Sequence, residues 1–197
     1  KIRRGILQSL RIVREIVHLR GYAPEKIMIE IPRDREGDNK KGNAGRTESR
    51  KDKLLALYKN CGKQASALFE RLEKETEDGL RRDRLYLYYT QFGKCMYSGE
   101  TIDIENLNTK EYCDIDHIFP RSLIKDDSLD NRVLVMAKLN REKTNDYPIK
   151  ADIRQKQHAM WRDLLQRGMI SQKKYDRLTR QSELTDEELT AFINRQI

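Results

Sequence analysis

The amino-acid sequence predicts an α+β fold that is mainly helical. Over most of the 197 residues, apolar positions recur three and four apart, which is the spacing of amphipathic helices. One short unit at residues 112–145 instead shows alternating and β-branched apolar residues on either side of a polar loop. Hydrophobic residues make up 37% of the chain and charged residues another 37%, so we expect one modest core and a heavily charged surface.

The N-terminal part predicts a helix, a strand and a linker. A helix is expected at residues 6–20, with a stop at Gly21. Its apolar face comprises Ile6, Leu10, Val13 and Val17. The Ile-rich run at 27–31 predicts a strand, in which Glu30 reads as a solvent-facing residue on a sheet edge. Residues 33–53 contain many charges and one apolar residue, Ala44, so we expect a flexible linker or hinge.

Two further helices are expected before the β-rich unit. A single amphipathic helix is predicted over residues 54–72, weakened in its middle by Gly62. A second is predicted over residues 80–92, where three arginines precede three tyrosines: Arg81, Arg82, Arg84, Tyr86, Tyr88 and Tyr89. This pattern is compatible with nucleic-acid stacking and, alternatively, with packing against a neighbouring helix. A tight turn around Ser98 and Gly99 should follow.

The unit at residues 112–145 predicts strand, loop, strand and helix. The first strand covers residues 113–118, and Pro120 prevents its regular continuation. The returning strand is the β-branched run at 133–136, and good helix formers occupy residues 137–143. This short unit can bring four polar side chains to one point: Asp116, His117, Asn131 and Asn140.

These four side chains suit metal-assisted phosphodiester hydrolysis. Carboxylate and amide oxygens are ligands that Mg²⁺ prefers, and a neutral imidazole can take a proton from water. Other interpretations fit the same residues. Asp116 and His117 could form an ordinary surface pair, and the two asparagines could serve as turn formers.

The C-terminal part predicts three helices. The first contains Trp161 and stops at Gly168, and a short second one begins at Ser171. Thr185 and Glu188 form a capping box for the third. Two further histidines, His18 and His158, are expected to be packed or exposed rather than catalytic.

The net charge, the cysteine spacing and the apolar runs of the sequence indicate which kinds of partner and compartment to expect. The formal net charge is +8, which favours a polyanionic partner, although a merely soluble basic protein would show the same excess. The three cysteines are scattered without a C-x-x-C pair, which fits a reducing cytoplasm and predicts no structural zinc. No apolar run long enough to span a bilayer and no signal peptide is visible, so no membrane partner is expected. Because residue 1 is Lys rather than Met, we expect a segment of a longer protein.

The stretch Asp114-Ile115-Asp116-His117-Ile118-Phe119-Pro120, followed by Asn131 and Asn140, closely resembles the ββα-metal motif of HNH endonucleases. The resemblance implies that His117 is the general base and that Asn131 positions the loop. It also implies that Asp116 and Asn140 hold a catalytic Mg²⁺, or alternatively Mn²⁺. Asn140 stands where that superfamily often has His, and its amide oxygen can still coordinate, whereas zinc would be a poor candidate.

Segments across the whole chain resemble the central region of the RNA-guided DNA endonuclease of type II CRISPR systems. They are Gly5–Gln8, Ile27–Glu30, Leu85–Tyr89, the motif above, Lys125–Asn131 and Phe192–Gln196. In that family the HNH domain is inserted into a RuvC-type nuclease. By resemblance, residues 1–32 are a RuvC-like segment in which Glu30 is a metal ligand of a second centre, incomplete here. Residues 54–180 are then the HNH domain, and 33–53 and 181–197 contain the two hinges, the latter with the start of the next RuvC-like helix.

The family resemblance also implies the partners. The expected activity is Mg-dependent cleavage of the DNA strand paired with guide RNA, in the bacterial cytoplasm and together with the remainder of the effector protein. Five basic residues near the motif could contact the nucleic-acid backbone: Arg121, Lys125, Arg132, Lys138 and Arg141. Two alternatives are a free-standing HNH nicking endonuclease and a non-catalytic nucleic-acid-binding regulatory module.

Overall fold

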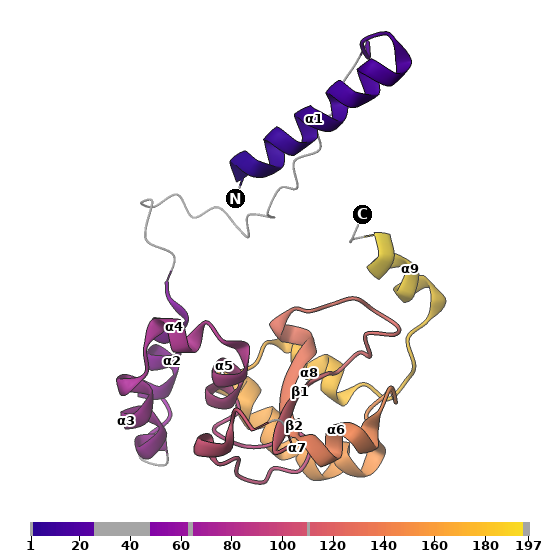
Figure 1. Ribbon diagram of the computed structural model, residues 1–197. Coiled ribbons are helices and arrows are strands. Elements are labelled where there is room, and N and C mark those ends of the chain that lie inside the picture. Colours follow the sequence, from indigo (N-terminus) through magenta and orange to yellow (C-terminus); the bar gives the residue numbers. More distant parts are fainter. Residues whose placement is uncertain (1, 26–47, 63–64, 110, 195–197) are drawn as a thin grey trace. The chain divides into compact units, whose positions relative to one another are not determined.

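The computed structural model describes residues 2–25, 48–62, 65–109 and 111–194 (Figure 1). The chain divides into two compact units, Lys1–Gly45 and Arg46–Ile197. In the first unit, α1 (Ile2–Arg20) ends at Gly21, which has φ +75° and donates its N–H to the Val17 carbonyl. This confirms the first predicted helix. The predicted strand at 27–31, Glu30 within it, and most of the predicted linker lie outside the described residues.

The second unit begins with two helices where the sequence predicted one. α2 (Arg50–Lys59) and α3 (Ser66–Lys74) are separated at Gly62, whose φ of +71° is a left-handed conformation that ends a helix. The prediction of a continuous helix over 54–72 was therefore wrong. The predicted linker also extended too far, because residues 50–53 form the first turn of α2, where the Ser49 side chain accepts the Asp52 N–H.

The expected helix at 80–92 is shorter and is preceded by a separate turn. α4 (Glu77–Leu80) begins at Thr76, whose side chain accepts the Gly79 N–H, and α5 spans Asp83–Thr90. Tyr88 and Tyr89 are buried. Arg84 donates to the backbone carbonyls of Leu107 and Cys113. These contacts favour the packing interpretation of this arginine- and tyrosine-rich segment.

A small antiparallel sheet lies at the centre of the second unit. β1 (Cys113–His117) pairs with β2 (Arg132–Met136), with Asp116 opposite Val133 and His117 opposite Arg132. Both strands are found where the sequence predicted them. Short 3₁₀ turns, η2 (Ile104–Asn106) and η3 (Leu129–Asn131), precede each strand. The predicted turn at Ser98 and Gly99 is closed by a bridge between Lys94 and Thr101.

Four helices follow the sheet. They are α6 (Ala137–Lys143), α7 (Ala151–Gln166), α8 (Gln172–Thr179) and α9 (Asp186–Asn194). Ser171 caps α8 by accepting the Lys174 N–H. Thr185 and Glu188 exchange the two hydrogen bonds of a capping box at α9. These predicted helices and caps are confirmed.

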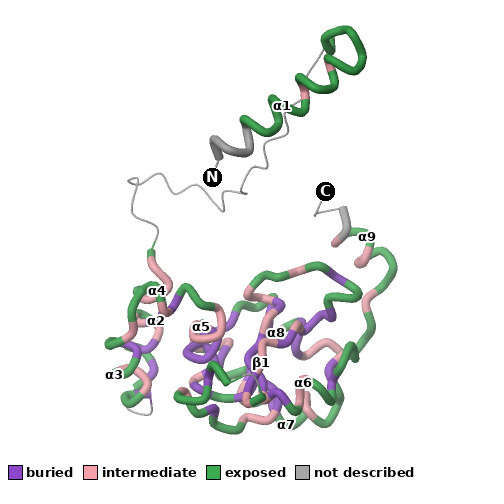
Figure 2. Tube along the Cα trace, in the orientation of Figure 1, coloured by how far each residue is buried: buried purple, intermediate pink, exposed green. Residues whose placement is uncertain are grey.

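The core of the second unit surrounds the sheet, where Figure 2 shows many buried positions. Helix α6 contacts both strands of the sheet, and α5 contacts β2. Trp161 of α7 is fully buried, and its Nε1 donates to the Met96 carbonyl at 2.9 Å. The prediction of a mainly helical α+β fold with one small sheet is therefore confirmed. Within the described ranges, no helix combines the length and apolar character needed to cross a membrane.

Candidate active site

Strand β1 and helix α6 face each other through two polar pairs. Asp114 and Asp116 are two residues apart on the strand, so they share one face. Asn140 and Lys143 are three apart on the helix and therefore also neighbours. Asn140 Nδ2 donates to Asp114 Oδ2 at 3.0 Å, and Lys143 Nζ lies 3.0 Å from Asp116 Oδ2. The strand–helix unit therefore gathers three of its oxygen-bearing side chains on one side.

Asp116 is a buried carboxylate with one oxygen in use. The residue is 7% exposed, and Oδ2 accepts the Tyr97 hydroxyl at 2.6 Å and forms an ion pair with the Lys143 ammonium. Oδ1 makes no hydrogen bond or ion pair with any residue in the described ranges. Burial raises the pKa of Tyr97 well above its ordinary value, so this phenol remains a proton donor.

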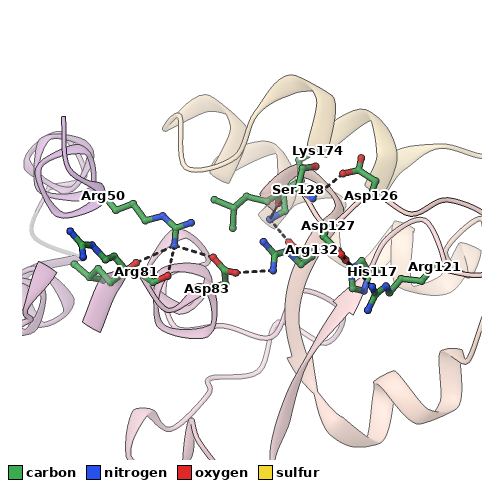
Figure 3. A network of polar contacts seen from close by, with 12 residues as sticks. Arg50, Arg81, Asp83, His117, Arg121, Asp126, Asp127, Ser128, Arg132 and Lys174 are labelled. Atoms are coloured by element: carbon green, nitrogen blue, oxygen red, sulfur yellow. Dashed lines mark hydrogen bonds and ion pairs between the residues drawn. The ribbon is translucent and has the colours of Figure 1, made fainter. Parts of the chain in front are cut away.

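His117 occupies the last position of β1 and is oriented by the loop that follows. Its Nε2 lies 2.8 Å from Asp127 Oδ1 (Figure 3). Its backbone carbonyl accepts a hydrogen bond from Lys143 Nζ. The hydrogen bond to His117 is the main cause of the lowered pKa of Asp127. An ionised carboxylate can only accept a hydrogen bond, so the proton of a neutral His117 lies on Nε2. The lone pair is then on Nδ1, the nitrogen that could take a proton.

Asn131 closes the loop between the two strands. It is fully buried at the end of η3, and its Oδ1 accepts the Phe119 N–H at 2.9 Å. Its Nδ2 donates to the carbonyls of Phe119 and Asp126 at 3.1 and 2.9 Å. These three hydrogen bonds connect the segment just after His117 to the segment that carries Asp127.

Two side chains of helix α8 bind the loop between β1 and β2. Lys174 is buried and donates to the carbonyls of Leu129 and Arg132, which flank Asn131. Arg177 pairs with Asp126 at 2.8 Å. Burial alone would raise the pKa of Asp126, but hydrogen bonds from Ser128 and Arg177 lower it to about 2.

The five basic candidates differ in their surroundings. Arg121 lies 3.3 Å from Asp127, and Arg132 pairs with Asp83 at 2.7 Å in a network that also includes Arg50 (Figure 3). Arg132 therefore joins β2 to α5. The remaining three residues are exposed: Lys125 lies in the loop between β1 and β2, and Lys138 and Arg141 lie on α6.

The other two histidines are exposed residues on helices. His158 contacts the Tyr175 hydroxyl at 3.1 Å, and His18 is exposed on α1. In the part of the chain that the structure describes, no three His, Cys, Asp or Glu side chains gather as a metal cluster. Four neighbours of the site were missed by the sequence reasoning: Asp114, Tyr97, Lys143 and Asp127. Asp114 and Lys143 could have been found by strand and helix periodicity, since each shares a face with a predicted site residue.

Comparison with known proteins identifies the family. Residues 95–149, which include all four motif side chains, match the HNH endonuclease family. The chain is 42% identical over 198 residues to the CRISPR-associated endonuclease Cas9 of Streptococcus mutans serotype c, and 39% identical to that of Listeria innocua serovar 6a. CRISPR-associated endonuclease Cas9 1 of Streptococcus thermophilus is 31% identical over 76% of the chain. The chain spans 14% of the length of each of these relatives. These matches confirm the resemblance expected from the motifs, and the chain is an HNH-domain segment of the Cas9 family of CRISPR-associated endonucleases.

Proposed function

We propose that this chain is the domain that hydrolyses DNA within an RNA-guided endonuclease. One observation carries the proposal. A buried carboxylate, Asp116, is adjacent to His117, whose imidazole is oriented by Asp127 so that Nδ1 is the basic nitrogen. An oxygen ligand for a cation and an oriented base are what metal-assisted phosphodiester hydrolysis requires. The relatives are named as endonucleases, which supports the same function.

The side chains of the site fit a hard divalent cation. Oδ1 of Asp116 has no partner among the described residues, and the amide of Asn140 is held through its nitrogen, which leaves its oxygen as the coordinating end. Mg²⁺ typically takes one or two protein ligands and keeps several waters, and Mn²⁺ accepts similar oxygen ligands. We therefore assign Asp116 and Asn140 as ligands of Mg²⁺, with Mn²⁺ as a substitute. When bound, the ion would supply Lewis-acid stabilisation of charge on the phosphate and the leaving 3′ oxygen.

The three cysteines are assigned to the core rather than to zinc. All are free and buried, and Cys95 Sγ accepts the Met136 N–H within the sheet region. Cys113 Sγ donates to the Leu107 carbonyl. Free thiols also suit our proposal that the protein acts in the bacterial cytoplasm.

His117 would act as the general base. Its Nδ1 accepts a proton from the attacking water, and the resulting positive imidazolium is stabilised by Asp127, which lies 2.8 Å from Nε2. Asn131 would keep this arrangement in place, because its hydrogen bonds fix the spacing between the end of β1 and the Asp127 segment.

We propose the DNA strand paired with guide RNA as substrate and the remainder of the effector as protein partner. The net charge of +8 and the exposed positions of Lys125, Lys138 and Arg141 favour contacts to a nucleic-acid backbone. Arg121, beside Asp127, could reach the same phosphates. Arg132 would act indirectly, because its ion pair with Asp83 would fix the start of β2.

We also propose the architecture that the family resemblance implies. The antiparallel order of β1 and β2 followed directly by α6 supports a ββα-metal core. Because α2 begins at Arg50, the nuclease domain would cover residues 50–180, with hinges within 33–49 and 181–197. Residues 1–32 would belong to a RuvC-like domain, with Glu30 as a ligand of that second centre.

The proposal is tested by cleavage of guide-matched DNA with the complete endonuclease that carries this segment. Wild type, His117→Ala and a control, His158→Ala, would be compared with Mg²⁺ and with EDTA. The control removes an exposed histidine of α7 whose partner is Tyr175. We expect wild type and His158→Ala to cut both strands in a metal-dependent reaction. His117→Ala alone should lose one of the two strand cuts. Retention of both cuts in that variant would overturn the proposal.

A further inference from the structure

Tyr97 is a buried tyrosine in the turn between α5 and β1, and its hydroxyl reaches the candidate site. It is 2% exposed, and its hydroxyl lies 2.6 Å from Asp116 Oδ2. The preceding residue, Met96, is anchored twice. Its N–H donates to the Leu134 carbonyl on β2, and its own carbonyl accepts Trp161 Nε1. The backbone that carries Tyr97 is therefore fixed to both the sheet and α7.

Tyr97 and Lys143 both contact the same oxygen of Asp116. Oδ2 accepts the hydrogen bond of the Tyr97 hydroxyl and lies 3.0 Å from the Lys143 ammonium in an ion pair, while Oδ1 has no partner among the residues described. A carboxylate held on one oxygen by a hydrogen bond and an ion pair is restricted in its rotation about the Cβ–Cγ bond, so Oδ1 has a defined direction. The hydrogen bond of Lys143 goes to the His117 carbonyl, and its side chain is long and flexible. Tyr97 has only two side-chain torsions and an anchored backbone, and it is therefore the more rigid of the two groups.

We infer that Tyr97 is a positioning residue: its hydroxyl fixes Asp116 Oδ2 so that Oδ1 is presented to the catalytic cation. The inference rests on the proposed function, because it takes Asp116 as the metal ligand. Tyr97 touches neither the cation nor the substrate, and it acts through Asp116. Hydrogen-bonding partners of metal ligands typically change metal affinity or activity by tenfold to a hundredfold when they are removed.

The chain offers a matched control for this inference. Tyr58 of α2 is also 2% exposed, and its hydroxyl donates to the Tyr89 carbonyl at 2.7 Å. Tyr97→Phe and Tyr58→Phe therefore each remove one buried hydroxyl and one short hydrogen bond. Only the first removes a bond to the proposed metal ligand.

The experiment is a titration of the 197-residue chain with Mn²⁺, followed by electron paramagnetic resonance of the free ion. We expect Tyr97→Phe to weaken Mn²⁺ binding by about tenfold or more, and Tyr58→Phe to bind like wild type. In the complete endonuclease, Tyr97→Phe should raise the Mg²⁺ concentration needed for half-maximal cleavage, with the rate largely recovered at saturating Mg²⁺. Equal Mn²⁺ affinity in the two variants, with or without a lowered melting temperature, would overturn the inference.

A third variant separates this inference from the proposed function. Asp116→Asn keeps an oxygen that can accept from Tyr97 but removes the ligand charge. We expect it to lose measurable Mn²⁺ binding. Undiminished binding in Asp116→Asn would refute the metal site itself. Loss of binding in Asp116→Asn together with wild-type binding in Tyr97→Phe would refute only the role of Tyr97.

Discussion

Replacing Asp116 with Ala should lower the free energy of unfolding by several kcal/mol, apart from any effect on catalysis. The side chains of Asp116 and Lys143 are 8% and 5% exposed, and their charged atoms are 3.0 Å apart. Without the carboxylate, the buried ammonium would keep one partner, the His117 carbonyl. Breaking a buried ion pair from one side typically costs about 3–5 kcal/mol. That is a large part of the roughly 5–15 kcal/mol that stabilises a typical protein.

A double-mutant cycle measures this coupling. The free energy of unfolding would be obtained from urea titrations of wild type, Asp116→Ala, Lys143→Met and the double variant, all in EDTA. Because the double variant leaves no buried charge, we expect it to be at least about 2 kcal/mol more stable than the sum of the single effects predicts. The control cycle uses Lys138 and Glu142, an exposed pair 3.9 Å apart on α6, with an expected coupling below about 0.5 kcal/mol.

Additive effects at Asp116 and Lys143, or a cost below about 1 kcal/mol for Asp116→Ala, would refute this reasoning. The result also affects how activity data are interpreted. Loss of cleavage in Asp116→Ala would combine lowered stability with loss of a metal ligand. The His117 side chain contacts Asp127, which is exposed. A substitution of His117 therefore tests catalysis with less effect on stability than a substitution of Asp116.

Three further predictions concern the loop and its supports. Asn131→Ala should lower the free energy of unfolding by about 3 kcal/mol in a urea titration, since three hydrogen bonds of about 1 kcal/mol each, two of them buried, are lost. Asp127→Asn should slow cleavage by about tenfold to a hundredfold without unfolding the domain, because an amide can donate to His117 Nε2 and favour the wrong tautomer. Burial lowers the pKa of Lys174 from 10.5 to about 7, so between these pH values the unfolded chain binds more protons than the folded one. The free energy of unfolding should therefore rise with pH, by at most about 1.4 kcal/mol per unit, and Lys174→Met should remove that contribution.

Each of these predictions has an outcome that contradicts it. A wild-type melting temperature for Asn131→Ala would show that the loop does not depend on this side chain. Unchanged cleavage by Asp127→Asn would show that the His117 contact is not needed in the reacting complex. For Lys174, the comparison is with Lys138→Met, whose side chain is 82% exposed. Parallel pH profiles for the two lysine variants would contradict the assignment.

The sequence predicted the sheet region well because its signals are local. The β-branched run at 133–136, the polar loop after Pro120 and the helix formers at 137–143 each specify their own conformation. The observed register places Asp116 opposite Val133, which the periodicity of either strand alone would not determine.

The helices before the sheet were harder to divide. The apolar stripe from Leu54 to Leu72 has helical spacing throughout, and two short helices that bury the same residues produce the same stripe. The break is decided by Gly62, where the backbone has φ +71°. A glycine within a helical pattern permits such a break without requiring it.

Some residues of the candidate site could also be predicted from the sequence, and others could not. Asp116, His117, Asn131 and Asn140 form a compact motif and could be selected from the sequence. Tyr97 could not, because it lies 19 residues before Asp116 and its hydroxyl reaches the site only after the turn packs on the sheet and α7. Contacts of this kind depend on tertiary packing and leave no periodic signal in the sequence.

The most direct test of the central claim is a strand-resolved cleavage assay of the complete endonuclease with His117→Ala. The two DNA strands would carry different labels, and the reaction would contain Mg²⁺ and a matching guide RNA. The proposed role of His117 as general base predicts that the guide-paired strand stays intact while the other strand is still cut. Cleavage of the guide-paired strand at the wild-type rate would contradict it and would show that the chemistry on that strand does not depend on this histidine.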